Sequence, residues 1–150
     1  MDNELDAEVA ARLRAVDQRF TANRRAVVEV LDRAEHPVSM AQILDSDRTL
    51  AQSSVYRNLL VLEEAGAVRR VVTDGTHARY ELAEDLTDHH HHLVCLDCGS
   101  VEDVPATTAL ESSVHRAVDD IDQATGFRTH HHRLDLVGVC RRCRGSDGRG

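Results

Sequence analysis

Residues 53–82, SSVYRNLLVLEEAGAVRRVVTDGTHARYEL, decide the expected fold because they join a helix to a pair of strands. Ser53 is the expected N-cap of a helix that runs to Ala65, and Gly66 is the expected stop. Apolar residues recur within this helix at steps of three and four. The helix therefore has one face that can be buried and one polar face that stays in water.

The second half of the same stretch predicts a β-hairpin. Two strand-like runs, 68–73 and 77–82, flank Asp74-Gly75, a dipeptide that suits the tight turn of a hairpin. Helices followed by such a hairpin are typical of a winged helix-turn-helix domain. A generic α+β scaffold has the same pattern, and we favour the winged helix.

Three further helices are expected upstream. The first covers 5–20, and the second begins after Thr21 as its N-cap and ends before His36-Pro37. Ser39 can cap a short third helix over 40–44, and a loop leads from there to the fourth helix. The winged-helix domain is therefore predicted to occupy residues 1–83.

The chain changes character after a short polar linker, predicted at 84–88. Strands, a helix and a last strand are expected at 91–95, 101–104, 107–124 and 133–139, with Gly126 ending the helix. These elements predict a small α/β domain over 89–145. Residues 146–150 are expected to form a disordered tail. The predicted fold class is thus α+β, a winged helix followed by an α/β domain.

All four cysteines fall into two CxxC pairs that frame this second domain. The pairs are Cys95 with Cys98 and Cys140 with Cys143. Each pair offers two thiolates on one tight turn, and together they make the closed set of four cysteines that is typical of structural zinc. Redox CxxC motifs are the alternative, but such proteins carry one motif ahead of a helix rather than two around a domain.

Seven of the ten histidines lie in two runs, at 89–92 and 130–132. In a strand, alternate side chains face opposite ways, so His90 and His92 would share one face and His89 and His91 the other. One run can then supply two metal sites with imidazole ligands. A solvated polar run, or adventitious metal binding, is the alternative.

Composition narrows the class of protein. The chain has 150 residues, of which 41% are hydrophobic, and 26 acidic residues outnumber 18 basic ones. This balance argues against a polybasic nucleic-acid binder and leaves room for one local Arg-lined surface. No apolar run approaches the ~20 residues that span a bilayer, and the acidic N-terminus is unlike a secretory signal. We expect a cytoplasmic protein with no membrane partner, in which reduced thiols need a role other than disulfides.

The exposed face of the predicted fourth helix is a candidate DNA-reading surface. In a winged helix this helix enters the major groove, where hydroxyl and amide groups contact base edges. The candidate DNA-binding residues are Ser53, Ser54, Tyr56, Arg57 and Asn58, with Arg24 as a candidate backbone contact. A solvated helix face is the alternative.

Three segments together resemble the ferric uptake regulator family. They are VYRNLLVLEEAGAV at 55–68, HHHHLVCLDCG at 89–99 and GFRTHHHRLDLVGVCRRC at 126–143. The resemblance implies a homodimeric, metal-responsive transcription factor, usually a repressor, that binds an operator in double-stranded DNA and is not an enzyme. It also implies that the α/β domain mediates dimerisation. A zinc enzyme and a metal buffer without DNA function are the alternatives from other classes.

The resemblance also assigns metal ligands. Cys95, Cys98, Cys140 and Cys143 match the family's structural zinc site. Glu81, His90, His92 and His36 match its regulatory hinge site, with His77 as a substitute for His36. His89, His91, Glu111 and His132 match an additional site. Tyr56, Arg57 and Arg24 match DNA-contacting positions.

Two sequence features bear on which metal is sensed, and they point in different directions. The hinge site lacks the cysteine of many zinc-sensing members, so its donors are nitrogen and oxygen, which suit Fe²⁺, Mn²⁺ or Zn²⁺. The unbroken four-His run resembles zinc-sensing members. We favour Zn²⁺ as the regulatory ion over Fe²⁺ and Mn²⁺, and an iron-responsive or peroxide-sensing member is the alternative.

Overall fold

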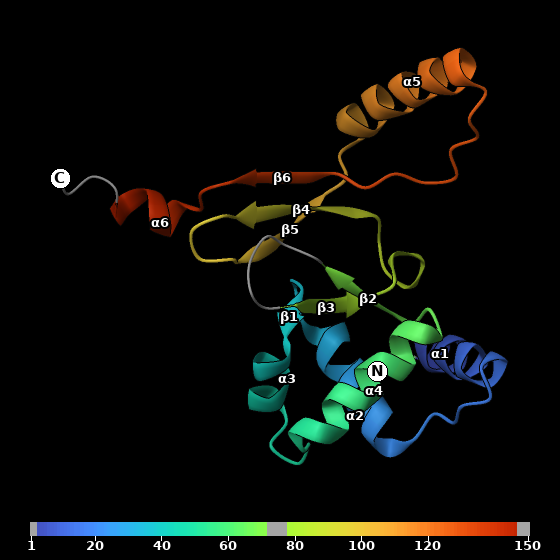
Figure 1. Ribbon diagram of the computed structural model, residues 1–150, viewed down its shortest axis with the longest axis vertical. Helices are drawn as coiled ribbons and strands as arrows, with labels where there is room; N and C mark the ends of the chain where they lie inside the picture. Colours follow the sequence, from blue (N-terminus) through green and yellow to red (C-terminus); the bar gives the residue numbers. More distant parts are fainter. Residues whose placement is uncertain (1–2, 72–77, 147–150) are drawn as a thin grey trace.

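The computed structural model describes residues 3–71 and 78–146 and is an α+β protein with two parts (Figure 1). We call residues 3–82 the winged part and residues 89–146 the sheet part. The winged part consists of α1 (Asn3–Ala15), α2 (Ala22–Arg33), β1 (Val38–Ser39), α3 (Met40–Ser46), α4 (Gln52–Glu64), β2 (Val68–Val71) and β3 (Arg79–Leu82).

Two of these helices, α2 and α3, begin at the N-cap residues that the sequence predicts. The Thr21 hydroxyl accepts a hydrogen bond from the Arg24 amide at the start of α2. At α3, Ser39 and Gln42 form a capping box, in which each side chain accepts a hydrogen bond from the other's backbone amide. Both N-cap predictions are therefore confirmed.

Two helix boundaries differ from the prediction. α1 ends at Ala15 instead of residue 20, because Asp17 adopts a positive φ of 57° and the Gln18 amide turns back to the Leu13 carbonyl at 2.8 Å. Ser53 is not the N-cap of α4. That helix begins at Gln52, and its first turn closes from the Val55 amide to the carbonyl of its N-cap, Ala51.

The winged part carries an antiparallel sheet in the order β1-β3-β2. Strand β1 is a two-residue element that the sequence does not predict. In the hairpin of β2 and β3, Arg69 lies directly opposite Glu81. The predicted turn residues Asp74-Gly75, and His77, lie outside the residues that the structure describes.

One apolar core holds the winged part together. Its fully buried members come from every helix, among them Leu13 of α1, Val28 of α2, Ile43 of α3 and Leu59 of α4. Leu82 of β3 closes the same core. The helical periodicity of apolar residues thus produces packed faces, and the opposite face of α4 is left open to solvent.

The sheet part is built around β4. It consists of β4 (His90–Cys95), β5 (Val101–Pro105), α5 (Thr108–Thr125), β6 (Asp135–Gly138) and α6 (Arg141–Ser146). The strand order is β5-β4-β6, with β5 antiparallel and β6 parallel to β4. Gly126 ends α5 with a φ of 72°, as the sequence predicts. In Figure 1 this sheet lies between α5 and the sheet of the winged part.

The linker and the end of the sheet part each contain a helical element that the sequence does not predict. The predicted polar linker at 84–88 contains a 3₁₀ turn, η1 (Glu84–Leu86), and Arg12 of α1 pairs with Asp85 and donates to the Gly66 carbonyl at 2.7 Å. Helix α6 is not predicted from the sequence and takes in Ser146, the first residue of the expected tail. Residues 147–150 lie outside the described part of the chain.

Candidate metal centres and nucleic-acid interface

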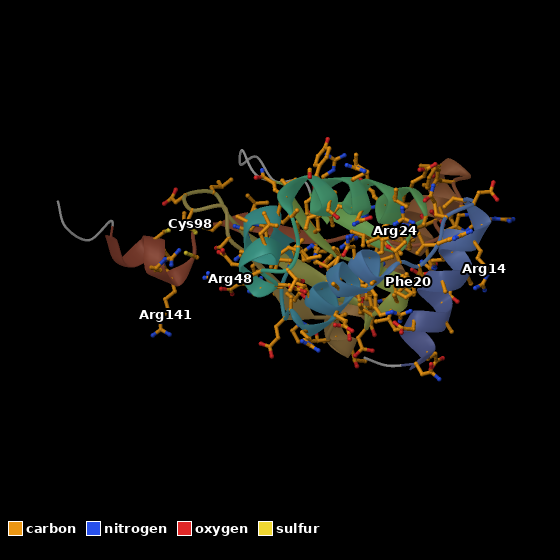
Figure 2. All side chains as sticks on the ribbon, turned by 90° about the horizontal axis from the view of Figure 1, so that it is seen from below. Arg14, Phe20, Arg24, Arg48, Cys98 and Arg141 are labelled. Carbon is orange, nitrogen blue, oxygen red and sulfur yellow. The ribbon has the colours of Figure 1, made fainter. Side chains whose placement is uncertain are left out.

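The four cysteines converge at one end of the sheet part, and we call them the four-cysteine cluster. Parallel pairing of β4 with β6 sets Cys95 opposite Gly138, so the second CxxC pair follows directly beside the first. The four Sγ atoms lie within 4.8 Å of one another, with 3.8 Å between Cys98 and Cys140. Figure 2 shows Cys98 and Arg141 at the end of the molecule away from Arg24 and Phe20.

The electrostatics of this cluster suit a dication. Hydrogen bonds from the side chain and backbone of Ser100 lower the pKa of Cys98 to about 6. A hydrogen bond to Cys140, followed by burial, raises the pKa of Cys143 to about 12. Thiolates held this close repel one another, and a bound cation would relieve that repulsion. The donor set fits Zn²⁺.

A second cluster lies between the two parts of the molecule. It contains Glu81 of β3, His90 and His92 of β4 and Asp103 of β5, and we call it the hinge cluster. Glu81 Oε2 is 3.1 Å from the Nε2 atoms of both histidines. Asp103 Oδ1 is 3.7 Å from Nε2 of His90 and 3.6 Å from that of His92.

The fourth member of this cluster is Asp103 and not His36. His36 is exposed, with its Nδ1 at 3.0 Å from the Pro37 carbonyl oxygen, and only lines a pocket beside Glu81, His90 and Asp103. Asp103 is brought in by the antiparallel register of β4 and β5, which sets it opposite His92. Sequence reasoning missed Asp103, and alternation from the buried Val101 was the available signal.

Burial and hydrogen bonding act in opposite directions on the hinge cluster. Burial raises the pKa of Glu81, but hydrogen bonds from His92 and Arg69 outweigh it and lower that pKa to about 2. Burial also raises the pKa of Asp103, whose buried Oδ1 has no hydrogen-bond partner among the described residues. A buried ionised carboxylate beside an unpartnered carboxylate oxygen fits a divalent cation held by nitrogen and oxygen donors.

The ring of His92 is oriented from its far side. Its Nδ1 lies 3.2 Å from Asp135 Oδ1 on β6, so Nε2 remains directed at Glu81. A carboxylate on the outer nitrogen of a histidine is the usual way to fix the tautomer of a metal ligand. Asp135 therefore positions His92 without belonging to the cluster.

The third cluster lies on the opposite face of β4. His89 and His91 meet Glu111 of α5 and His132, which precedes β6. Glu111 Oε2 is 3.1 Å from His89 Nε2 and 2.9 Å from His132 Nε2. Adjacent histidines thus serve different clusters, as the alternation of a strand predicts.

The candidate DNA-binding residues divide into two groups. Tyr56 (53% exposed), Ser53 and Arg57 lie on the solvent face of α4 together with Gln52. The other three predicted residues, Arg24, Ser54 and Asn58, are half-buried and hydrogen-bonded to one another. Arg24 Nε donates to Asn58 Oδ1 at 3.2 Å, and the Asn58 amide donates to Ser54 Oγ at 3.2 Å. This chain of contacts fixes α4 against α2.

A winged helix joined to a sheet part with three clusters of metal-ligating residues defines a class of protein, the metal-binding DNA-binding regulators. Residues 15–137 match the model of the Ferric uptake regulator family. The chain therefore belongs to the ferric uptake regulator family. Members of this family are metal-responsive, DNA-binding transcriptional regulators and not enzymes.

Two curated relatives and one solved structure show how far the similarity extends. The ferric uptake regulation protein of Bacillus subtilis (strain 168) is 28% identical, covering 98% of this chain and 99% of its own. The peroxide operon regulator of the same organism is 28% identical over 91% of each chain. The Helicobacter pylori ferric uptake regulator, whose structure reveals three functional metal binding sites, is 25% identical with a TM-score of 0.74, covering 94% of this chain and 92% of that chain.

None of the helices in the described residues has the length and apolar character needed to cross a membrane.

Proposed function

We propose that this chain is a cytoplasmic, homodimeric transcriptional repressor whose binding to an operator is switched on by a divalent metal ion. The observation that carries the proposal is the position of the hinge cluster. Glu81 ends the hairpin of the winged part, whereas His90, His92 and Asp103 belong to the sheet part. Because the ligands come from both parts, a bound ion would affect how the winged part is positioned relative to the sheet part.

The mechanism follows from that position. Glu81 on one side and the two histidines with Asp103 on the other would hold the ion, which supplies the positive charge that draws the two sides together. The angle between the winged and sheet parts is then fixed. In a dimer that angle sets the separation of the two α4 helices, which must match the spacing of two half-sites on DNA. Without the ion only a fraction of dimers would have this geometry, and the apparent affinity for DNA falls by that fraction.

We assign the three clusters different tasks. The four-cysteine cluster would hold structural Zn²⁺, because it offers four sulfur donors and no open position. The hinge cluster is the regulatory site, and we favour Zn²⁺ there over Fe²⁺ and Mn²⁺ since four convergent donors are the number that zinc commonly takes. The cluster of His89, His91, Glu111 and His132 is the additional site.

Solvent-exposed side chains indicate which surfaces would contact DNA and which would contact a second copy of the chain. Ser53, Tyr56 and Arg57 would contact the operator, while the half-buried Arg24, Ser54 and Asn58 hold α4 in place for that contact. Homodimerisation through the sheet part is supported by apolar side chains left in solvent. Ile121 of α5 is 55% exposed, and Val137 of β6 is 59% exposed.

The proposal is tested by fluorescence anisotropy on DNA from the protein's own promoter. The four-cysteine cluster is first loaded with zinc, and buffered free Zn²⁺, Mn²⁺ and anaerobic Fe²⁺ are then titrated separately. For His90→Ala with His92→Ala we expect metal-dependent DNA binding to be lost, because two of the four candidate ligands of the hinge cluster are removed. A folded dimer should remain.

A matched control is His130→Ala with His131→Ala, which removes two imidazoles outside all three clusters and should leave the titration unchanged. The assignment of the hinge cluster as the regulatory site is wrong if the His90/His92 variant binds DNA like the wild type at limiting metal. Tight stoichiometric metal uptake without metal-dependent DNA binding would instead identify a metal buffer. The free concentration at which each ion drives DNA binding is then compared with the free concentration of that ion in the cell, because availability as well as affinity selects the corepressor.

A further inference from the structure

Among the described residues, Arg69 is an arginine that contacts the hinge cluster without being one of its metal-ligating residues. It lies on β2, directly opposite Glu81 in the antiparallel register. Its Nε donates to Glu81 Oε1 at 3.1 Å, and its terminal Nη2 contacts the same oxygen. The side chains of Arg69 and Glu81 are only 18% and 9% exposed, so the pair is largely withdrawn from water.

The two oxygens of Glu81 therefore have different partners. Oε1 accepts from Arg69 and also lies 3.1 Å from His92 Nε2. Oε2 is 3.1 Å from the Nε2 atoms of both His90 and His92 and, within the part of the chain that the structure describes, accepts no hydrogen bond from Arg69. Oε2 can thus ligate a metal ion and leave the arginine pair intact, whereas Oε1 is already occupied by both nitrogens of Arg69.

Breaking that pair is costly because it is buried. Removing Arg69 from Oε1 would leave a guanidinium without its carboxylate in a site with little water. The neighbouring Arg70 is in a different position. It is 48% exposed and reaches Glu63 at 3.5 Å, so it has no part in the hinge cluster.

We propose that Arg69 is a specificity-determining residue of the hinge cluster, which holds Glu81 to a single metal-ligating oxygen and so favours Zn²⁺ over Mn²⁺. This inference rests on the proposed function of that cluster as a metal site. Zinc is commonly four-coordinate, and one oxygen from Glu81 completes a set with His90, His92 and Asp103. Manganese prefers octahedral, oxygen-rich surroundings and gains more from a second carboxylate oxygen.

The charge of Arg69 acts in the same direction. Glu81, Asp103 and Asp135 surround the two histidines with three carboxylates, and Arg69 offsets one of them. Ions that depend mainly on carboxylate charge lose more from this offset than an ion that binds imidazole strongly. Arg69 is therefore a positioning residue that acts through Glu81 and contacts no metal itself.

The test compares Arg69→Met with Arg69→Lys and with the control Arg70→Met in the full chain with zinc at the four-cysteine cluster. Mn²⁺ binding is followed by electron paramagnetic resonance, and Zn²⁺ binding by competition with a chromophoric chelator. The hinge contribution is the part of each signal that is lost when His90→Ala and His92→Ala are added. Thermal melting of the metal-free proteins reports whether each variant is folded.

For Arg69→Met we expect Mn²⁺ affinity to rise by about 10-fold and Zn²⁺ affinity to change by less than about threefold, on the scale of other changes around metal ligands. Arg70→Met should change neither affinity. Arg69→Lys keeps a cation on Glu81 and should retain the wild-type ratio, which keeps the test decisive if Arg69→Met fails to fold.

The inference is overturned if the ratio of Zn²⁺ to Mn²⁺ affinity is the same in Arg69→Met and wild type, or if Arg70→Met changes it equally. For an unfolded Arg69→Met, a changed ratio in Arg69→Lys overturns it. Failure of the proposed function looks different. In that case the wild type itself has no metal signal that depends on His90 and His92, and the inference falls with it.

Discussion

The winged part and the sheet part are held together in different ways. Among the described residues, fifteen buried side chains form one apolar cluster in the winged part, whereas β4 and β5 share a cluster of three with Val71 of β2. Helix α5 has no fully buried residue, and all four residues of β6 are exposed. Apolar burial therefore stabilises the winged part directly, since each buried Val or Leu contributes about 1.5–3 kcal/mol.

The sheet part compensates with ligand clusters and with surfaces suited to a second copy. Its two ends meet at the four-cysteine cluster, and α5 meets β4 through the histidines around Glu111. For a part with so little core of its own, we expect stability to depend on metal and on assembly. The comparison predicts that the winged part keeps its structure when the metal-ligating clusters of the sheet part are disrupted. Three substitutions test this contrast.

The largest effect is expected for Cys140→Ser. Loss of one thiolate from a structural zinc site forfeits most of a binding free energy on the order of 10 kcal/mol. The sheet part should lose its fixed structure and its dimer, while amide signals of the winged part persist in a two-dimensional NMR spectrum. Chelator-treated wild type is the control and should give the same spectrum. A cooperative, zinc-free sheet part would contradict the contrast.

A medium effect is expected for Leu59→Ala in the core of the winged part. Leu59 is 1% exposed, and truncating such a residue costs about 2–5 kcal/mol of the free energy of unfolding. Zinc content should stay unchanged, because the clusters lie elsewhere. The measurement is denaturant unfolding followed by circular dichroism.

The adjacent Leu60→Ala is the matched control, since Leu60 is 45% exposed and should cost no more than about 0.5 kcal/mol. Equal losses for the two leucines would show that burial does not decide stability here.

The smallest effect is expected for Ser39→Ala, which removes half of the capping box of α3. The cost should be about 1 kcal/mol of the free energy of unfolding. Ser53→Ala is the comparison, because Ser53 makes no capping contact at α4 and its loss should be nearly neutral. If Ser53→Ala costs as much as Ser39→Ala, the assignment of Ala51 as the N-cap is wrong.

What could be predicted from the sequence was mostly local. The caps at Thr21 and Ser39 and the stop at Gly126 depend on residues a few positions apart, and the structure confirms all three. The start of α4 was mispredicted because Ser53 satisfies the same local rule, yet the first turn closes on the Ala51 carbonyl.

In the candidate sites too, features that depend on neighbouring residues were predictable and features that depend on strand pairing were not. Alternation along one strand is a local property, so the separation of His90 and His92 from His89 and His91 was predictable. Alternation from Val101 could place Asp103 on the buried face of its strand, but its position opposite His92 depends on the pairing register of β4 and β5, which the local pattern does not give. The pairing of Arg69 with Glu81 was not predicted for the same reason, since it is a cross-strand pair.

Strand β4 supplies residues to all three clusters: His90 and His92 to one, His91 to another and Cys95 to the last. An ion bound at any one cluster would therefore also stiffen the six-residue strand that carries residues of the other two. The same economy makes the histidine run intolerant of length changes. If the register of Leu93–Cys95 is kept, deleting His92 would turn His89, His90 and His91 to the opposite face and exchange imidazoles between the hinge and additional sites.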